Sequence, residues 1–350
     1  MKLKEDGVRL FGLIRSYLTD YLPNRRNASA NTIRAYRTVL NQFLGHVTES
    51  RADGLVGATL ADFDGEHVSG YLDRIESGGK CSTRTRNHRL NCLRAFVSYA
   101  ASTDIGAISL NDSIRKIPYK ARASDEPVKF MSERAVNALL RAPDRKTNRG
   151  RRDFALLAFM YDSASRVQEC VGMRLSDVDL GECPKATLRG KGRKTRQVPL
   201  MDSTARVLRR YAAEFHPDAR LHPDAPLFYA RGAGVKKRLT EDWVRKLLAR
   251  YGEISAASEP EVPGRVHPHM LRHSRAMHLY QSGMRLELLS QWLGHAQLET
   301  TLIYAHADSE MKRKAIEAAT PVDSPLGKHV KPARMKIEDD DTIRKLYGLK

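Results

Sequence analysis

Residues 153–173, DFALLAFMYDSASRVQECVGM, form the centre of the C-terminal half of the chain. Residues 153–163 are apolar on nearly every face, which is typical of a helix buried inside a domain. A shorter helix is expected over 167–173, and residues 186–200, ATLRGKGRKTRQVPL, predict two strands around a Gly-Lys-Gly turn. A buried helix beside one small hairpin indicates a mainly helical domain with a small β-sheet, an α+β fold.

Helical spacing of apolar residues extends outward on both sides of this centre. In the N-terminal part it predicts helices over 9–22 and 31–47, a third that ends at 77–79, and a fourth over 83–101. In the C-terminal part, a short helix after Ser132 precedes helices over 203–215, 240–251, 267–282, 285–293 and 298–318. Ser29 or Asn31, together with Thr240, suit the position before a helix start.

These patterns predict four regions of the chain. An all-α domain occupies residues 1–105, and a mainly helical second domain occupies 129–318. Between them, residues 106–128 have no helical periodicity and contain Pro118 and Pro127, so we expect a linker. Residues 319–350 hold an acidic run, 338–341, and are expected to form a flexible tail that ends in a short helix.

Composition points to a polyanionic partner. The 350 residues include 60 Lys and Arg against 41 Asp and Glu, a net charge of +19 at pH 7, although such a surplus can also serve solubility alone. There is no run of 18 apolar residues and no apolar N-terminal signal, so we expect a soluble cytoplasmic protein with no membrane contact. The four cysteines lack zinc-site spacing and are expected to be free thiols.

Three segments concentrate side chains that could perform chemistry. Arg166 follows the buried helix, and Glu169 lies one helical turn later, where it could hold the guanidinium. Lys191 sits at the tip of the predicted hairpin between two glycines. The third segment is HPHMLRH over 267–273, in which His269 and Arg272 share one helix face. Taken singly, each of these residues is more typical of a structural ion pair, a solvated turn or a core position.

Two more candidates follow the third segment. His295 comes 26 residues after His269, and Tyr304 comes nine residues after His295. Neither a HExxH pattern nor a phosphate-binding glycine loop accompanies them, so the sequence predicts neither a metal nor a nucleotide cofactor.

The ordered set Arg166, Lys191, His269, Arg272, His295 and Tyr304 resembles the active site of the tyrosine recombinase (phage integrase) family. The strings around these residues also resemble that family, and NASANTIRAYRTVLNQFLGHV (27–47) is similar to its helical, SAM-like DNA-binding domain. The resemblance covers about residues 8–315. It departs at Ser163-Ala164-Ser165, where the family commonly has Thr-Gly-Leu.

The resemblance implies a site-specific DNA recombinase of the integrase or transposase type. Tyr304 would attack the scissile phosphate and form a 3′-phosphotyrosine, and Lys191 would protonate the leaving 5′-oxygen. Arg166 and Arg272 would bind the non-bridging oxygens of the phosphate, and His295 would donate a hydrogen bond to it. His269 would act as general acid and base towards the tyrosine. Glu169 would orient these groups without contacting the phosphate. No role is expected for the other histidines, although His273 could be structural.

The resemblance also implies partners. These are double-stranded DNA recombination sites, further copies of the chain in a tetramer that exchanges the C-terminal helix around 310–316, and accessory recombination proteins. Phosphate contacts are expected from a basic helix and from the hairpin, through Arg84, Arg86, Arg89, Arg94, Arg193 and Lys194. Two alternatives stay open: a type IB topoisomerase, which uses the same chemistry, and a non-catalytic DNA-binding accessory protein. We expect a bacterial cytoplasmic protein that associates with the nucleoid when it is bound to DNA.

Overall fold

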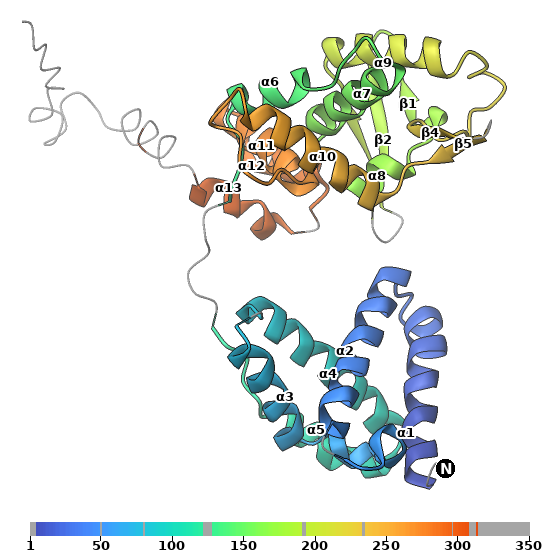
Figure 1. Ribbon diagram of the computed structural model, residues 1–350, viewed down its shortest axis with the longest axis vertical. Helices are drawn as coiled ribbons and strands as arrows, with labels where there is room; N and C mark the ends of the chain where they lie inside the picture. The colour runs from blue at the N-terminus through green and yellow to red at the C-terminus, as the bar shows by residue number, and fades with distance from the viewer. Residues whose placement is uncertain are drawn as a thin grey trace, which may run out of the picture. The chain divides into compact units, whose positions relative to one another are not determined.

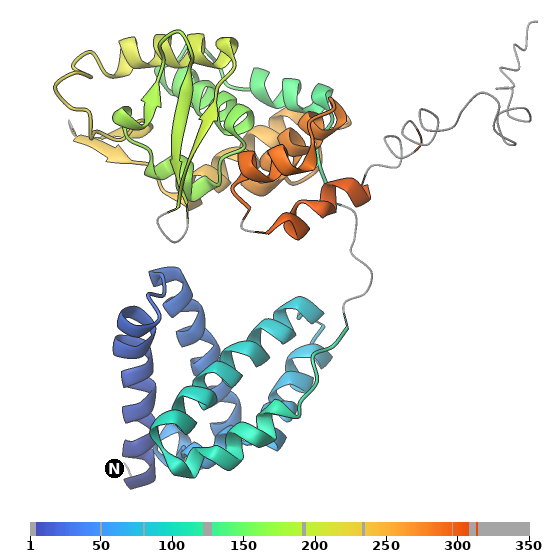
Figure 2. The same ribbon diagram turned by 180° about the vertical axis from the view of Figure 1, so that it is seen from behind.

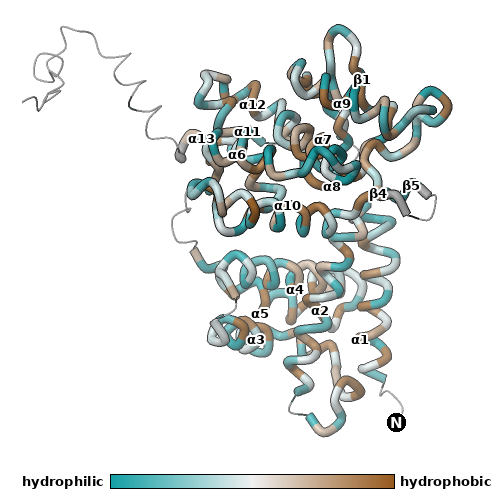
Figure 3. The backbone as a smooth tube through the Cα atoms, turned by 45° about the horizontal axis from the view of Figure 1, so that its top comes forward, coloured by the Kyte–Doolittle hydropathy of each residue, from teal (hydrophilic) through white to brown (hydrophobic). Residues whose placement is uncertain are grey.

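The computed structural model describes residues 5–49, 51–79, 81–121, 128–190, 194–232, 235–295, 297–307 and 313. The chain divides into two compact units, Met1–Asp125 and Glu126–Lys350 (Figure 1). Each unit has a hydrophobic core of its own. Brown and teal segments alternate along the helices of both units, as expected for amphipathic helices (Figure 3).

The described residues of the N-terminal unit form helices and no strand. Its α-helices are α1 (Glu5–Ser16), α2 (Ala30–Thr48), α3 (Gly65–Ser77), α4 (Thr83–Thr103) and α5 (Ile108–Arg115). Of the two predicted candidates, Ser29 caps α2 by accepting a hydrogen bond from the Thr32 backbone N–H. At the centre of the core, the ring of Phe63 lies 4.7 Å from that of Phe43 and 5.0 Å from that of Phe96.

Two predictions for this unit were wrong in detail. The helix expected over 9–22 does not end before Pro23, because α1 continues as a π-helical segment, Tyr17–Arg25, that contains the proline. The predicted linker 106–128 begins as structure: α5 packs into the core through Ile114, and Ile117 is also buried. Eight residues are too few for a clear helical period, which is why the sequence pattern missed this helix.

The C-terminal unit surrounds the buried helix with which the sequence analysis began. Its helices are α6 (Glu133–Arg141), α7 (Asn148–Ser163), α8 (Val167–Gly172), α9 (Asp202–Phe215), α10 (Glu241–Ala256), α11 (Pro268–Gln281), α12 (Leu286–Leu293) and α13 (Leu302–Ala307). Thr240 caps α10, as predicted, and Ser132 caps α6. Leu156, Leu157 and Phe159 of α7 are fully buried.

A small antiparallel sheet lies beside these helices (Figure 2). Its strand order is β1 (Val178–Asp179), β2 (Lys185–Arg189) and β3 (Thr195–Pro199). The predicted hairpin is therefore confirmed, with Leu188 opposite Arg196. A second hairpin, β4 (Tyr229–Gly232) with β5 (Val235–Arg238), was not predicted because its second strand, VKKR, lacks apolar alternation.

Helices α11, α12 and α13 gather at one side of the C-terminal unit, orange to red in Figure 1. A small apolar cluster joins them to the end of α7 through Ala164, Met277, Leu293 and Tyr304. Where the structure describes the helix predicted over 298–318, it consists of a short 3₁₀ turn, Leu298–Thr300, followed by α13. The predicted exchange helix around 310–316 and the tail 319–350 lie almost wholly outside the described residues, with Arg313 alone included. No described helix has the length and apolar character that crossing a membrane requires.

The close packing of the turn before α7 predicts that one added methyl group at Gly150 lowers the stability of the protein. A Cβ atom on Gly150 would lie 1.9 Å from the backbone carbonyl oxygen of Asp144, which cannot move without displacing the turn. We expect Gly150→Ala to lower the free energy of unfolding by about 2–3 kcal/mol in urea titrations.

The matched control is Gly172→Ala, at the end of α8, where an added Cβ meets nothing within 4 Å. This change should leave stability within about 1 kcal/mol of wild type, in the stabilising direction. Equal destabilisation by both substitutions would contradict the geometry of the turn.

Candidate active site

The site is built around one buried carboxylate. Glu169 lies in the first turn of α8, and its side chain is only 2% exposed. Its Oε2 accepts a hydrogen bond from the backbone N–H of Arg166 at 2.8 Å, and its Oε1 accepts one from Nη1 of the same residue at 2.9 Å. The predicted pair thus contains two hydrogen bonds, one of which also caps the helix.

A second arginine, which the sequence analysis missed, completes this cluster. Arg196 of β3 donates from Nη1 to Oε1 of Glu169 at 2.8 Å and from Nη2 to Oε2 at 2.9 Å. Burial by itself would raise the pKa of Glu169, but Arg196 and then Arg166 outweigh it and lower the pKa to about 2. We call Arg166, Glu169 and Arg196 the carboxylate cluster. The sequence signal that could have identified Arg196 is the alternation of side chains along a strand. Arg196 lies two residues before the buried Val198 and so shares the inward face of β3 with it.

Arg272 is held by the ends of two helices. It is 3% exposed and donates to the carbonyl oxygen of Ala164 at 2.7 Å and to that of Leu293 at 2.5 Å. Ala164 and Gly294 adopt left-handed conformations, with φ of 47° and 63°, that end α7 and α12 beside this arginine. Helix C-terminal ends carry negative partial charge, which suits a cation. Burial and the nearby Arg166 lower the pKa of Arg272 to about 9.

At Ser163-Ala164-Ser165, the family commonly has Thr-Gly-Leu, so Ala164 stands where glycine is usual. Glycine would adopt this left-handed conformation without strain. Alanine at positive φ costs roughly 1–2 kcal/mol. The Ala164 carbonyl still reaches Arg272, so the substitution retains the contact.

Tyr304 is fully buried in α13, and its hydroxyl lies 2.8 Å from Nδ1 of His273. Burial raises the pKa of the tyrosine to about 12, so the phenol keeps its proton at neutral pH. In the described arrangement the hydroxyl is hydrogen-bonded to His273, and the acid–base role expected of His269 stays a prediction. Since His269 and His273 are one turn apart on α11, their shared face could not distinguish them in sequence.

The other histidines are placed as follows. His295 follows Gly294, and its Nδ1 lies 2.9 Å from the hydroxyl of the buried Thr301. Burial and the charges of Arg272 and Arg166 lower the pKa of His295 to about 4, and burial with the neighbouring His269 lowers that of His273 to about 4. His269 is exposed on α11, and its pKa is lowered by partial desolvation and by Arg272. All three imidazoles are therefore neutral at pH 7.

The predicted DNA contacts divide into two groups. In α4, Arg84 is exposed, and Arg89 is half-buried and donates to the hydroxyl of Tyr71. Arg86 is buried against the Pro118 carbonyl, and Arg94 donates to the carbonyls of Ile114 and Arg115 at the end of α5. These last two arginines bond backbone carbonyls at the end of α5 and just after it, so the structure gives them a structural role, and phosphate contacts by them stay a prediction. Lys194 is exposed, whereas Lys191 and Arg193 lie outside the described residues.

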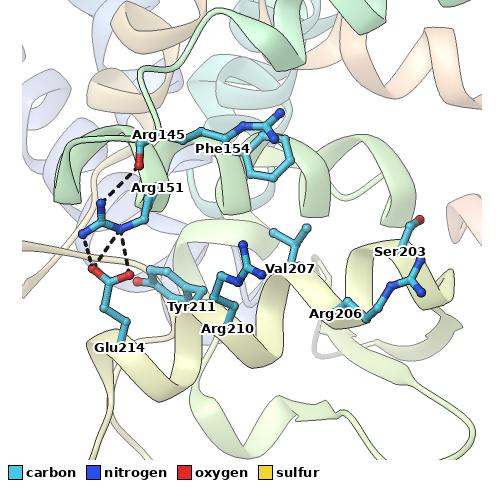
Figure 4. A pocket seen from close by; sticks show the side chains of 9 residues that line it. All are labelled: Arg145, Arg151, Phe154, Ser203, Arg206, Val207, Arg210, Tyr211 and Glu214. Carbon is cyan, nitrogen blue, oxygen red and sulfur yellow. Dashed lines mark hydrogen bonds and ion pairs between the residues drawn. The ribbon is translucent and has the colours of Figure 1, made fainter.

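A separate pocket lies between α7 and α9. It has a volume of about 370 Å³, and its lining includes four arginines, Arg145, Arg151, Arg206 and Arg210 (Figure 4). Arg151 is paired with Glu214, and Arg145 stacks on Phe154. None of the predicted site residues lines it. Among the described residues, no group of three or more His, Cys, Asp or Glu side chains is arranged to hold a metal ion.

Comparison with known families covers both units. The Phage integrase family matches residues 129–311, and the Phage integrase N-terminal SAM-like domain matches residues 14–103. The protein y4rC of Sinorhizobium fredii, named as a candidate integrase/recombinase, is 33% identical over 88% of this chain and 91% of its own length. The tyrosine recombinase XerC of Methylobacterium nodulans is 30% identical over 86% of this chain and 90% of its own.

Solved structures share the fold. The XerH site-specific recombinase in its post-cleavage complex with a palindromic difH substrate matches with a TM-score of 0.63 and 23% identity, over 90% of this chain and 89% of that one. The Tn1549 transposon integrase bound to transposon right-end DNA matches with a TM-score of 0.64 and 17% identity, over 86% and 98%. The family matches cover most of the chain, and the two curated relatives are similar over nearly their full length. The chain belongs to the phage integrase family of tyrosine recombinases, and it is a site-specific DNA recombinase of the strand-transferase class.

Proposed function

We propose that Tyr304 is the nucleophile of DNA cleavage. Its oxygen attacks the scissile phosphorus as the bond to the 5′-oxygen breaks, which leaves a 3′-phosphotyrosine and a free 5′-hydroxyl. The observation that supports this is the convergence of α8, α11, α12 and α13. It brings the buried tyrosine near Arg272 and Arg166, and the charges of both arginines lower the pKa of Tyr304.

The two arginines supply the electrostatic stabilisation. Planar guanidinium groups pair with the non-bridging oxygens of a phosphate better than an ammonium does, and they favour the charge that builds up in the transition state. Arg166 is the more accessible of the two, with 35% of its side chain exposed. His295, fixed through Nδ1 by Thr301, donates to the phosphate. Lys191 protonates the 5′-oxygen, a role that rests on the hairpin motif alone.

The proton of the tyrosine has two possible acceptors. The family resemblance assigns it to His269, whereas in this structure the hydroxyl is hydrogen-bonded to His273. Tyr304 is fully buried here, so a phosphate can reach it only after α13 shifts. We therefore assign His273 to the closed arrangement and keep His269 for acid–base chemistry once the tyrosine is exposed.

We further propose an integrase or transposase that acts on double-stranded recombination sites as a tetramer, without metal or nucleotide, with accessory proteins, in the bacterial cytoplasm and nucleoid. Rejoining needs no fuel because the phosphotyrosine ester retains the energy of the bond that was cut. The DNA-bound XerH and Tn1549 integrase structures support a DNA partner. Relaxation of supercoils by a monomer, without site preference, would instead favour the topoisomerase alternative.

The first test traps the covalent intermediate. Nicked suicide substrates that carry candidate element ends should give a protein–DNA adduct with wild type and none with Tyr304→Phe, because the phosphotyrosine cannot form. Denaturing gel electrophoresis and mass spectrometry of the adduct would measure this.

Tyr161→Phe provides the matched control, since the Tyr161 hydroxyl also bonds a histidine, with 2.7 Å to Nδ1 of His278. It should give the adduct at close to the wild-type level. An undiminished adduct in Tyr304→Phe would show that another residue is the nucleophile.

A second test concerns the basic helix α4. Because Arg84 is exposed, Arg84→Gln should weaken DNA binding and reduce the slope of log affinity against log salt by about one. Fluorescence anisotropy at several salt concentrations would measure the slope.

Arg86→Gln is the comparison within the same helix. Since Arg86 is buried beside Glu76 and the Pro118 carbonyl, its loss should lower the stability of the N-terminal unit by about 2–4 kcal/mol and leave the slope unchanged in the folded protein. An unchanged slope in Arg84→Gln would contradict the phosphate contact.

A further inference from the structure

Arg196 connects three elements of the C-terminal unit through one side chain. Its two Nη atoms pair with the carboxylate of Glu169 in α8, and its Nε donates to the carbonyl oxygen of Trp292 in α12 at 2.8 Å. The side chain itself extends from β3 and is 12% exposed. None of the roles proposed above includes this residue.

The hydrogen bonds of Glu169 are fully allocated. A carboxylate offers about four acceptor positions. Oε1 accepts from Nη1 of both Arg166 and Arg196, and Oε2 accepts from Nη2 of Arg196 and from the Arg166 backbone N–H. The side chain of Arg166 therefore gains one bond to the carboxylate, where an isolated Arg–Glu pair would form two.

The rest of the Arg166 guanidinium is left for another anion. Its Nη2 makes one long contact, 3.5 Å, to the Gly294 carbonyl oxygen, and the described residues supply no partner for Nε. Without Arg196, two acceptor positions of Glu169 would open beside Arg166. The guanidinium could then turn and pair with both carboxylate oxygens, which would withdraw it from a phosphate.

We propose that Arg196 is a positioning residue that occupies Glu169 and so keeps Arg166 available for the scissile phosphate. This inference rests on the proposed function, in which Arg166 binds that phosphate. Arg196 acts through Arg166 and need not touch DNA itself.

The same side chain fixes the end of α12. A Cβ atom on Gly294 would lie 2.9 Å from Cδ of Arg196, so the left-handed glycine packs directly on the arginine stem. The preceding carbonyl, that of Leu293, holds Arg272, and the following residue is His295. Arg196 thus sets the distance between the Arg166 side of the site and the Arg272 side.

The test measures the rate of adduct formation in a single turnover at saturating DNA, per folded molecule. Arg196→Gln should slow cleavage about 10- to 100-fold while non-covalent DNA affinity stays within about threefold of wild type. Adding Glu169→Gln should restore much of the lost rate, because a neutral amide no longer captures Arg166.

Arg275→Gln is the matched control. The Arg275–Asp162 pair is buried to nearly the same extent, 13% and 3% exposed against 12% and 2% for Arg196–Glu169, and joins α11 to α7. Its loss should lower stability as Arg196→Gln does but leave the cleavage rate per folded molecule within about threefold of wild type.

Each outcome decides the proposal. A double variant that cleaves no faster than Arg196→Gln, or an Arg275→Gln variant that is slowed equally, would overturn it in favour of a general structural role. If wild type forms no adduct on any element end, the proposed function fails instead, so the two failures are distinguishable.

Discussion

The C-terminal unit depends on the balance between one buried carboxylate and the arginines around it. Isolated in the interior, the charge of Glu169 would cost several kcal/mol, and the same holds for the guanidinium of Arg272. Arg196 and Arg166 offset the first cost by saturating the carboxylate with hydrogen bonds. The surplus positive charge then remains on Arg166 and Arg272, where, in the proposed function, the scissile phosphate would complete the neutralisation.

Helix ends supply the remaining compensation. The guanidinium of Arg272 donates to two backbone carbonyls, and the C-terminal ends of helices offer carbonyls that lack a partner within the helix. This requires α7 and α12 to stop at the same point in space, and both stop through a left-handed residue. The lengths of α7 and α12 therefore determine whether Arg272 can be held in the site. Lengthening either helix by a turn would remove one of the two carbonyl acceptors of this arginine.

Sequence reasoning succeeded where a signal is local. The caps at Ser29 and Thr240, the buried α7 and the β2–β3 hairpin follow from periodicity and hydrogen bonding within a few residues. It failed where partners are distant. Arg196 meets Glu169 across 27 residues, and His273 meets Tyr304 across 31. Glu169 and Tyr304 were identified from the sequence, but tertiary packing decides which of the nearby arginines and histidines contacts each of them.

The closed position of Tyr304 also links exposure to activation. With a pKa of about 12, its phenol is ionised in only about one molecule in 10⁵ at pH 7 (12 − 7 = 5 pH units). Burial raises this pKa, whereas the charges of Arg272 and Arg166 lower it. A rearrangement that brings the hydroxyl to a phosphate removes the burial and leaves the arginines in place. In the proposed function, exposure lowers the pKa of the tyrosine through the loss of burial, and the two arginines offset the opposing charge of the phosphate, so exposure and activation are linked.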